Sequence, residues 1–389
     1  QMHNTDGNLL RFNVVGDSIR EYVLFNPSDA FLVARIQPIP NQNLHSIQVA
    51  DMIIVAPPQF RTHAEAMAAL HLQHDGMESV VACINEIYNE FGSGKPDVTA
   101  LRDFIRMVYL RNSERLKYVL LFGDASFDYK NRIPNNTNLI PTYQSVQSII
   151  ETQSFVSDDY FGLMGSTEGQ DMQGVLDLGI GRFPVSTQEE AGLMVEKNFR
   201  YLSALESHRG PWQNYITFMA DDGDGNLHMS QAETLAMRVD TAYQNFNIRK
   251  IYLDAFRRVA VPGGFRYPDA TAALLKAIND GSLIVNYTGH GGVSGLTDEK
   301  VFSITEIEGL RNRDRMAFFI TATCEFSRFD NPGLVSAGER LLLNPTGGAI
   351  ALMTTTRLAF AHSNFNVNLR LYASLMTEGK SDINRLGDI

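Results

Sequence analysis

A lone cysteine follows a short apolar run in the stretch FFITATCEFSRFD, residues 318–330. Cys324 is one of only two cysteines in the 389-residue chain. A thiol becomes a nucleophile when a nearby base or cation favours the thiolate, and the base is often a histidine distant in sequence but close in the fold. Free cysteine is also among the most buried residue types, so a buried strand-end thiol is an equal alternative for Cys324 taken alone.

A histidine with glycines on both sides follows a second apolar run, in LIVNYTGHGG, residues 283–292. Glycine lets the backbone approach a substrate closely, and the amides of Gly291 and Cys324 would be natural donors to an acyl oxyanion. A capping histidine in a tight turn is the alternative for His290. Together, His290 and Cys324 favour a base and a nucleophile for acyl transfer.

Acidic residues close a third apolar run, in NYITFMADDGDG, residues 214–225. The sites of parallel α/β sheets lie beyond the carboxyl ends of the strands, so Asp221, His290 and Cys324 are expected at one sheet edge. Asp221 could then orient His290, as the third group of a triad does. Asp124 closes a fourth run, in the first half of the chain.

The elements that must position these residues alternate between short apolar runs and amphipathic segments. This alternation predicts an α/β protein with mostly parallel sheets, in which one helical crossover places His290 beside Cys324. The alternation occurs twice, separated near residues 206–212, and a β-rich segment precedes it. We expect the end of a preceding β-rich domain in residues 1–55, one α/β subdomain in 56–205 and a second, with the catalytic residues, in 206–389.

The composition is that of an ordinary globular protein, with 44% hydrophobic and 20% charged residues. A net charge of −11 without a basic cluster argues against nucleic acid and anionic membrane surfaces as partners. No apolar run is long enough to cross a membrane. Two cysteines are too few for a disulfide scaffold or a cysteine zinc site, and Cys83 is expected in the core. We expect the chain to be a fragment whose targeting signal lies elsewhere.

The acidic segment DDGDGN, residues 221–226, resembles part of a calcium loop but lacks the glutamate that completes one. Asp221, Asp222 and Asp224 are therefore candidate calcium ligands, with a solvated turn as the alternative. Asp222, His228 and Glu325 are candidates for substrate or ion contacts. No cofactor is expected to be required.

The histidine and cysteine stretches resemble the motifs of the gingipain-like cysteine peptidases of the caspase-like clan. The resemblance extends over roughly residues 40–389 and includes YVLLFGDASFDYKN, SDDYFG, DLGIGRFPVST and LLLNPTGGAIALMTTTR. It implies two caspase-like, Rossmann-like subdomains flanked by helices. It also implies Cys324 as nucleophile, His290 as general base and acid, and the N–H groups of Gly291 and Cys324 as the oxyanion hole.

At the position of Asp221 the gingipains carry a glutamate that orients the histidine. Asp222 follows directly here, and the resemblance leaves open which aspartate acts. Gingipains also cut after Arg or Lys and need an acid at the base of the specificity pocket. The segment NLHMSQAET, residues 226–234, offers no acid that aligns with that role, so cleavage after basic residues is not expected.

Within this family, NQNLHSIQVADMIIVAP and IYNEFGSGKPDVTALRDF most resemble the sortase of the type IX secretion system. This finer resemblance implies a cell-surface enzyme that removes the C-terminal secretion domain of cargo proteins through a Cys324 thioester. The cargo would then pass to an amine of a surface lipopolysaccharide, and other secretion components would be partners. Two alternatives are a purely hydrolytic peptidase of the same family and a non-catalytic caspase-like scaffold.

Overall fold

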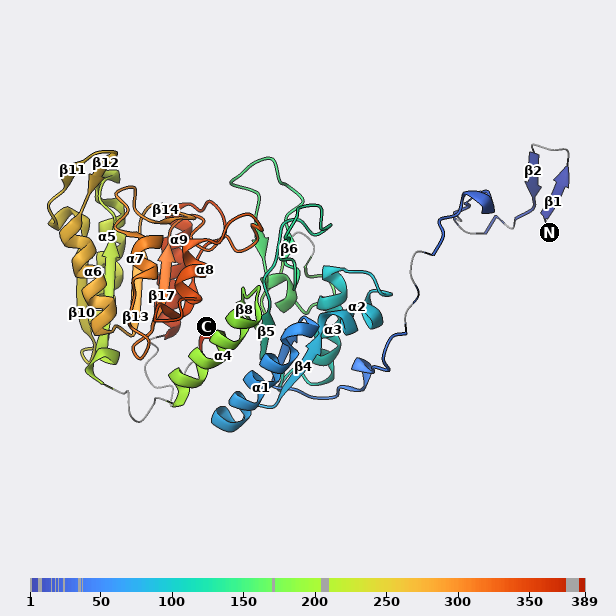
Figure 1. Cartoon of the computed structure of the whole chain (residues 1–389), viewed down its shortest axis with the longest axis horizontal. Helices are drawn as coiled ribbons and strands as arrows, with labels where there is room; N and C mark the ends of the chain where they lie inside the picture. The colour runs from blue at the N-terminus through green and yellow to red at the C-terminus, as the bar shows by residue number, and fades with distance from the viewer. Residues whose placement is uncertain are drawn as a thin grey trace. The chain divides into compact units, whose positions relative to one another are not determined.

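The computed structural model of the chain describes residues 2–5, 9–14, 16–17, 19, 21–23, 25–33, 36, 38–169, 172–203, 210–375 and 385–388. The chain divides into two compact units, residues 1–42 and 43–389. The first unit contains an antiparallel pair of strands, β1 (Met2–Thr5) and β2 (Leu9–Phe12). The large unit holds two parallel sheets with helices on both faces (Figure 1).

The first sheet has four parallel strands in the order β4-β3-β5-β8. Its strands are β3 (Met52–Ala56), β4 (Ser79–Cys83), β5 (Tyr118–Phe122) and β8 (Gly179–Phe183), and its helices are α1 (Arg61–Asp75), α2 (Ile84–Phe91), α3 (Val98–Arg111) and α4 (Gln188–Ser203). Alternate residues of β3 face opposite layers: Ile53 packs in a cluster with α2 and α3, and Ile54 packs with α1 and α4. Burial on both faces explains why these strands read as continuous apolar runs.

The second sheet has five parallel strands in the order β10-β9-β13-β17-β18. Its strands are β9 (Tyr215–Ala220), β10 (Asn247–Tyr252), β13 (Ile284–Thr288), β17 (Ala317–Ala322) and β18 (Ala349–Met353), and its helices are α5 (Leu227–Ala242), α6 (Pro268–Asp280), α7 (Ile304–Glu308), α8 (Ala337–Leu342) and α9 (Ala361–Leu375). Helices α5 and α9 pack on one face, against Phe218 and Ile320, and α6, α7 and α8 pack on the other, against Val285 and Phe319.

Short strands and turns of 3-10 helix connect these elements. The strands are β6 (Tyr143–Gln144), β7 (Val156–Ser157), β11 (Val259–Val261), β12 (Gly264–Arg266), β14 (Gly291–Gly292), β15 (Gly295–Leu296) and β16 (Phe302–Ser303). The 3-10 turns are η1 (Pro27–Asp29), η2 (Leu44–Ser46), η3 (Pro58–Phe60), η4 (Asp159–Gly162), η6 (Pro211–Asn214), η7 (Asp224–Asn226), η8 (Leu253–Ala255) and η9 (Leu386–Asp388).

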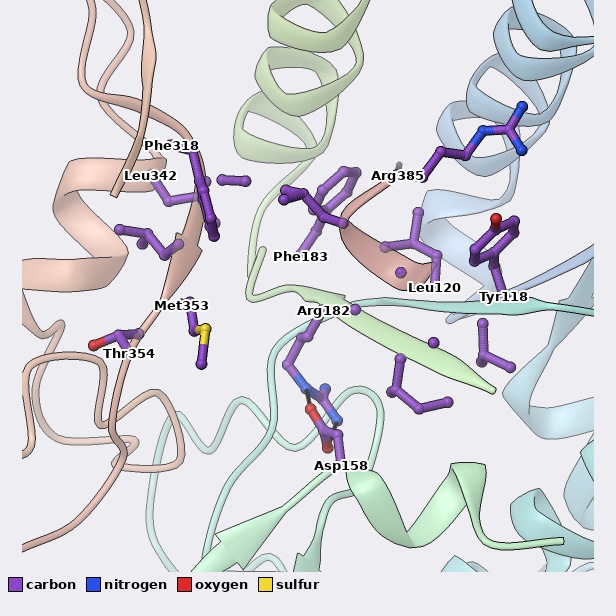
Figure 2. A pocket seen from close by; sticks show the side chains of 18 of the residues that line it. Tyr118, Leu120, Asp158, Arg182, Phe183, Phe318, Leu342, Met353, Thr354 and Arg385 are labelled. Carbon is purple, nitrogen blue, oxygen red and sulfur yellow. Dashed lines mark hydrogen bonds and ion pairs between the residues drawn. The ribbon is translucent and has the colours of Figure 1, made fainter. Parts of the chain in front are cut away.

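A buried lysine connects the half of the chain that holds the first sheet with the half that holds the second. Nζ of Lys197, on α4, donates hydrogen bonds to the carbonyl oxygens of Leu342 at 2.5 Å and Gly347 at 3.0 Å. A cavity of about 800 Å³ lies between the edge strands β8 and β18, and Figure 2 shows some of its lining. Phe318, Leu342 and Met353 line it from the second half, and Leu120, Phe183 and the ion pair Arg182–Asp158 line it from the first.

The structure confirms the predicted fold class of mostly parallel sheets flanked by helices. The predicted boundary at residue 55 falls inside β3, every residue of which is buried and which pairs with β4 and β5, so that run belongs to the first sheet. Part of the predicted separation near 206–212 lies outside the described residues. The boundaries as domain limits stay a prediction.

Candidate active site

Three neighbouring strands of the second sheet end at the same level. Thr288, the last residue of β13, pairs with Ala220 of β9 on one side and Ala322 of β17 on the other. The pairing continues one step beyond the strands, because Asp221 N–H donates to the Thr288 carbonyl at 3.1 Å and Gly289 N–H donates to the Ala322 carbonyl at 3.3 Å. His290 and Cys324 each follow two residues after a paired strand end.

The loops that carry the histidine and the cysteine lie against each other. A Cβ placed on Gly291 would lie 2.6 Å from Oγ1 of Thr323, the residue before Cys324. A Cβ on Gly289 would lie 2.4 Å from Cβ of Asp221. Glycine is therefore required on both sides of His290, because the backbone at Gly289 lies against the loop of Asp221 and the backbone at Gly291 lies against the loop of Cys324.

Asp221 is a buried centre of hydrogen bonds. Its Oδ2 accepts from the backbone N–H of His290 at 3.0 Å and from the hydroxyl of Tyr287 at 3.2 Å, and only 4% of the residue is exposed. Burial raises the pKa of Asp221 to about 6, against these two hydrogen bonds. The Tyr287 hydroxyl oxygen also lies 2.5 Å from the His290 carbonyl oxygen, so its one proton is shared between this carbonyl and Asp221. Asp221 thus holds the backbone of His290 in place. That Asp221 also orients the imidazole ring stays a prediction.

The imidazole of His290 contacts a different acid. Its Nε2 lies 2.6 Å from Oδ2 of Asp224, and Nε2 of His228 lies 3.1 Å from the same oxygen. Burial opposes the charged ring, but the hydrogen bond and charge of Asp224 prevail and raise the pKa of His290. The hydrogen bond from His290 lowers the pKa of Asp224 in turn. Burial, with the nearby charge of His290, lowers the pKa of His228.

The sulfur of Cys324 lies against the loop that follows β18. Ala359 N–H points at Sγ over 3.4 Å, and Sγ lies 3.5 Å from the Ala359 carbonyl. The fully buried carboxylate of Asp330 binds this loop through both terminal nitrogens of Arg357, at 2.7 and 2.5 Å. The ring of His290 and the sulfur of Cys324 are thus brought to one edge, each with its own hydrogen-bond partner.

The other predicted contacts have partners within the protein. Asp222 accepts from the hydroxyl of Tyr267 at 2.7 Å, and Glu325 pairs with Arg328 at 2.7 Å. Carboxylate oxygens of Asp221, Asp222 and Glu299 lie within 4.8 Å of one another and are the hard oxygen ligands that calcium prefers. Glu299 is also paired with Arg258, at 2.8 Å. Calcium at this edge stays a prediction.

Sequence reasoning missed two features of the site. Asp224 entered only as a candidate calcium ligand, although it provides the acid on the ring. The contacts of Ala359 and Arg357 were missed entirely, because they lie 35 and 27 residues from Cys324 and Asp330. The only sequence signal for Asp224 was the run of aspartate, glycine and asparagine in residues 221–226. These residue types tolerate positive φ best, and every residue of the turn from Gly223 to Asn226 has positive φ.

Comparison with known proteins gives this edge its context. The sequence profile of peptidase family C25 matches residues 45–389. The chain belongs to peptidase family C25. No curated protein sequence matches the chain.

Two solved gingipain structures agree with the family assignment in fold. The complex of Porphyromonas gingivalis RgpB pro- and mature domains is 20% identical, over 84% of this chain and 69% of that one, with a TM-score of 0.62. The Arg specific cysteine proteinase gingipain R (RGPB) is 18% identical, over 90% and 71%, with a TM-score of 0.64. Dimeric latent PorU from Porphyromonas gingivalis is 32% identical over 44% of this chain and 17% of that one, with a TM-score of 0.39.

These findings confirm the resemblance to gingipain-like cysteine peptidases and the caspase-like arrangement of the fold. Within the part of the chain that the structure describes, no helix has both the length and the apolar character needed to cross a membrane.

Proposed function

We propose that this member of peptidase family C25 is a cysteine endopeptidase with Cys324 as nucleophile and His290 as general base and acid. The observation that carries the proposal is the register of the central strands. Thr288 pairs with Ala322, and each of the two chemical groups follows two residues later. Parallel α/β sheets bind their ligands at this edge.

In the proposed mechanism, the Cys324 thiolate attacks a peptide carbonyl of the substrate. The backbone N–H groups of Gly291 and Cys324 receive the negative charge that develops on the carbonyl oxygen, and one such donor is commonly worth about 2.7–4 kcal/mol. His290 then gives its proton to the leaving amine, which departs and leaves a thioester on Cys324. An amine or a water molecule attacks the thioester and regenerates the thiol.

Two acids support the histidine in different ways. Asp221 holds the backbone of His290, and Asp224 binds the ring at Nε2. Nδ1 is then the nitrogen left to exchange a proton with the sulfur. An acid at the far nitrogen stabilises the imidazolium that forms when the ring takes up that proton.

The finer proposal concerns the substrate. The motifs in residues 41–57 and 87–104 support a sortase similar to PorU that acts in type IX secretion on the outer cell surface. Its substrates would be cargo proteins with C-terminal secretion domains, and its acceptor an amine of lipopolysaccharide. The absence of an aligned acid in residues 226–234 supports a cut after a residue other than Arg or Lys.

The proposal is tested with Cys324→Ala. The side chain is half-buried and its partner is a backbone group, so the variant should fold. Cargo incubated with the wild-type enzyme should lose its C-terminal domain, and cargo incubated with the variant should stay intact. Complete processing by the variant would refute the assignment of Cys324.

The transfer step is tested separately from cleavage. A purely hydrolytic peptidase would leave a free carboxylate at the new end of the cargo, whatever amine is added. A sortase would join an added amine nucleophile to that end, and mass spectrometry of the cargo terminus distinguishes the two products.

The non-catalytic alternative is tested by the two thiols. Cys83 is 3% exposed, and burial raises its pKa. Iodoacetamide near neutral pH should therefore label Cys324 much faster than Cys83 if Cys324 is an activated nucleophile. Equal and slow labelling of both would favour the scaffold.

A further inference from the structure

Two imidazoles converge on one carboxylate oxygen at the proposed catalytic edge. Oδ2 of Asp224 lies 2.6 Å from Nε2 of His290 and 3.1 Å from Nε2 of His228, and all three atoms lie within 4.8 Å of one another. We propose that Asp224, His228 and His290 form an inhibitory site for zinc or a similar transition-metal ion. The inhibitory part rests on the proposed function of His290, whereas the metal site itself does not.

The donor set selects the class of ion. Two imidazole nitrogens with one carboxylate oxygen suit zinc and its neighbours, whereas calcium and magnesium prefer oxygen ligands alone. In a tetrahedral site with ligands about 2.0–2.1 Å from zinc, neighbouring ligand atoms are about 3.3 Å apart. The 3.1 Å separation between the Asp224 oxygen and Nε2 of His228 is close to that value, and Nε2 of His290, at 2.6 Å, would have to move away from the oxygen when zinc binds.

The positions of the three side chains suit a site that fills and empties. The side chain of His228 is 6% exposed, so it provides a fixed ligand on α5. The side chains of His290 and Asp224 are 56% and 47% exposed, so an ion can reach them from solvent with water as a fourth ligand. Asp224 lies in the left-handed turn before α5 and His228 lies in the first turn of that helix, and this turn brings the two side chains into contact.

Only an imidazole nitrogen that carries no proton can bind a metal, so zinc binding at the two Nε2 atoms competes with protons.

The site lacks the outer support of a permanent metal centre. A metal-bound histidine normally donates its other N–H to an acceptor, and loss of such a partner typically lowers affinity about 10–100-fold. Nδ1 of His228 is buried and has no hydrogen-bond partner among the described residues. We therefore infer reversible binding, removable by a chelator, rather than a resident cofactor.

Metal binding at Nε2 of His290 stops the chemistry for a simple reason. A neutral ring bound through Nε2 carries its one proton on Nδ1, so neither nitrogen can accept the proton of the Cys324 thiol. Zinc at this site would hold the ring against Asp224 and leave the thiol without its base.

The metal site is tested by zinc titration calorimetry of the metal-free chain carrying Cys324→Ala, which removes the sulfur as a competing ligand. We expect one equivalent of zinc to bind, and cobalt to give visible absorption in the same protein. Adding His228→Asn should weaken zinc binding at least tenfold. The matched control is His45→Asn, because His45 also contacts a carboxylate, that of Glu90 at 2.6 Å, but belongs to no group of three such ligands among the described residues.

Absence of binding, or binding that His228→Asn leaves unchanged, would overturn the metal site. Its inhibitory role is tested in the enzyme with Cys324 intact, with each variant compared with its own zinc-free rate. Zinc should inhibit, a chelator should restore the rate, and His228→Asn should raise the zinc concentration required. Zinc binding that depends on His228 but leaves turnover unchanged overturns inhibition. Failure of all peptidase activity would instead count against the proposed function, and the calorimetry would still decide the site.

Discussion

Nε2 of His290 lies 2.6 Å from Oδ2 of Asp224, whereas Asp221 binds the backbone N–H of the same histidine. Support of the ring and support of the backbone therefore come from two acids three residues apart. Only the exposed acid, Asp224, contacts the group that is proposed to move protons.

The first prediction is that Asp224→Asn lowers the pKa of His290. Burial opposes protonation of the ring, and the Asp224 carboxylate outweighs it by stabilising the imidazolium. Without the carboxylate charge, the ring should lose its proton at a lower pH than in the wild type. NMR titration of the His290 ring measures this directly. If neutral His290 is required for attack, the acidic limb of the kcat/KM profile should move to lower pH as well.

The matched control for this titration is Asp222→Asn. Asp222 is two residues from Asp224, but its carboxylate binds the hydroxyl of Tyr267. Its replacement should move the His290 pKa less than Asp224→Asn does. An equal or larger shift would mean that the general acidity of the loop, rather than the contact with Asp224, raises the pKa of the ring.

The second prediction separates two glycines that flank His290. A Cβ on Gly289 would lie 2.4 Å from both Cβ of Asp221 and the Tyr287 hydroxyl oxygen, whereas a Cβ on Gly292 meets nothing within 4 Å. Gly289→Ala should lower the free energy of unfolding by about 1–3 kcal/mol or more, because the buried neighbours must move. Gly292→Ala should leave it within about 0.5 kcal/mol of the wild type. Denaturant unfolding of both variants tests the contrast, and equal stabilities would contradict it.

The register of the site could be predicted from the sequence, but its side-chain partners could not. Apolar runs that end in Thr288 and Ala322, with one helical segment between them, are enough to place His290 and Cys324 on neighbouring strand ends. The direction of the Asp224 side chain depends on the turn from Gly223 to Asn226, in which every residue has positive φ. No periodic pattern specifies such a turn.

Long-range polar pairs were beyond sequence reasoning for a related reason. The partner of the buried carboxylate of Asp330 is Arg357, on another loop, and the local sequence around either residue does not predict the other as its partner. The first sheet's strand β3 was assigned to the preceding segment because its apolar run resembles any short strand. Only its pairing with β4 and β5 shows which sheet it joins.

The third prediction concerns that arginine. Arg357→Met would leave the Asp330 carboxylate buried without a counter-charge, and breaking a buried pair typically costs about 3–5 kcal/mol. The free energy of unfolding should fall by that order. The same loop places Ala359 against the sulfur of Cys324, so the rate at which Cys324 is alkylated should also differ from that of the wild type.

The double variant Asp330→Asn with Arg357→Met is the control for the buried pair. Removing the charge together with its partner should recover part of the lost stability, since the orphaned carboxylate is gone. A double variant that is less stable by the sum of the two single losses would show that the pair is not coupled.

The fourth prediction concerns Lys197, the buried lysine that connects the half with the first sheet to the half with the second. Burial lowers the pKa of Lys197 to about 7, whereas a lysine in the unfolded chain keeps a pKa of about 10.4. Between these values the unfolded chain binds the extra proton, so Lys197 makes stability rise with pH, by up to about 1.4 kcal/mol per pH unit. Lys197→Met removes this dependence, and the stability of the wild type relative to the variant should therefore increase from pH 7 to pH 9.

Unfolding at several pH values tests the lysine prediction, with Lys276→Met as the matched control. Lys276 is 76% exposed and pairs with Asp280 on the surface of α6. Its replacement should leave the slope of stability against pH unchanged, because its ammonium group faces water in the folded chain as it does in the unfolded one. Equal slopes for the wild type and Lys197→Met would mean that Lys197 stays charged in the folded protein. The carbonyls of Leu342 and Gly347 would then bind an ammonium ion rather than an amine.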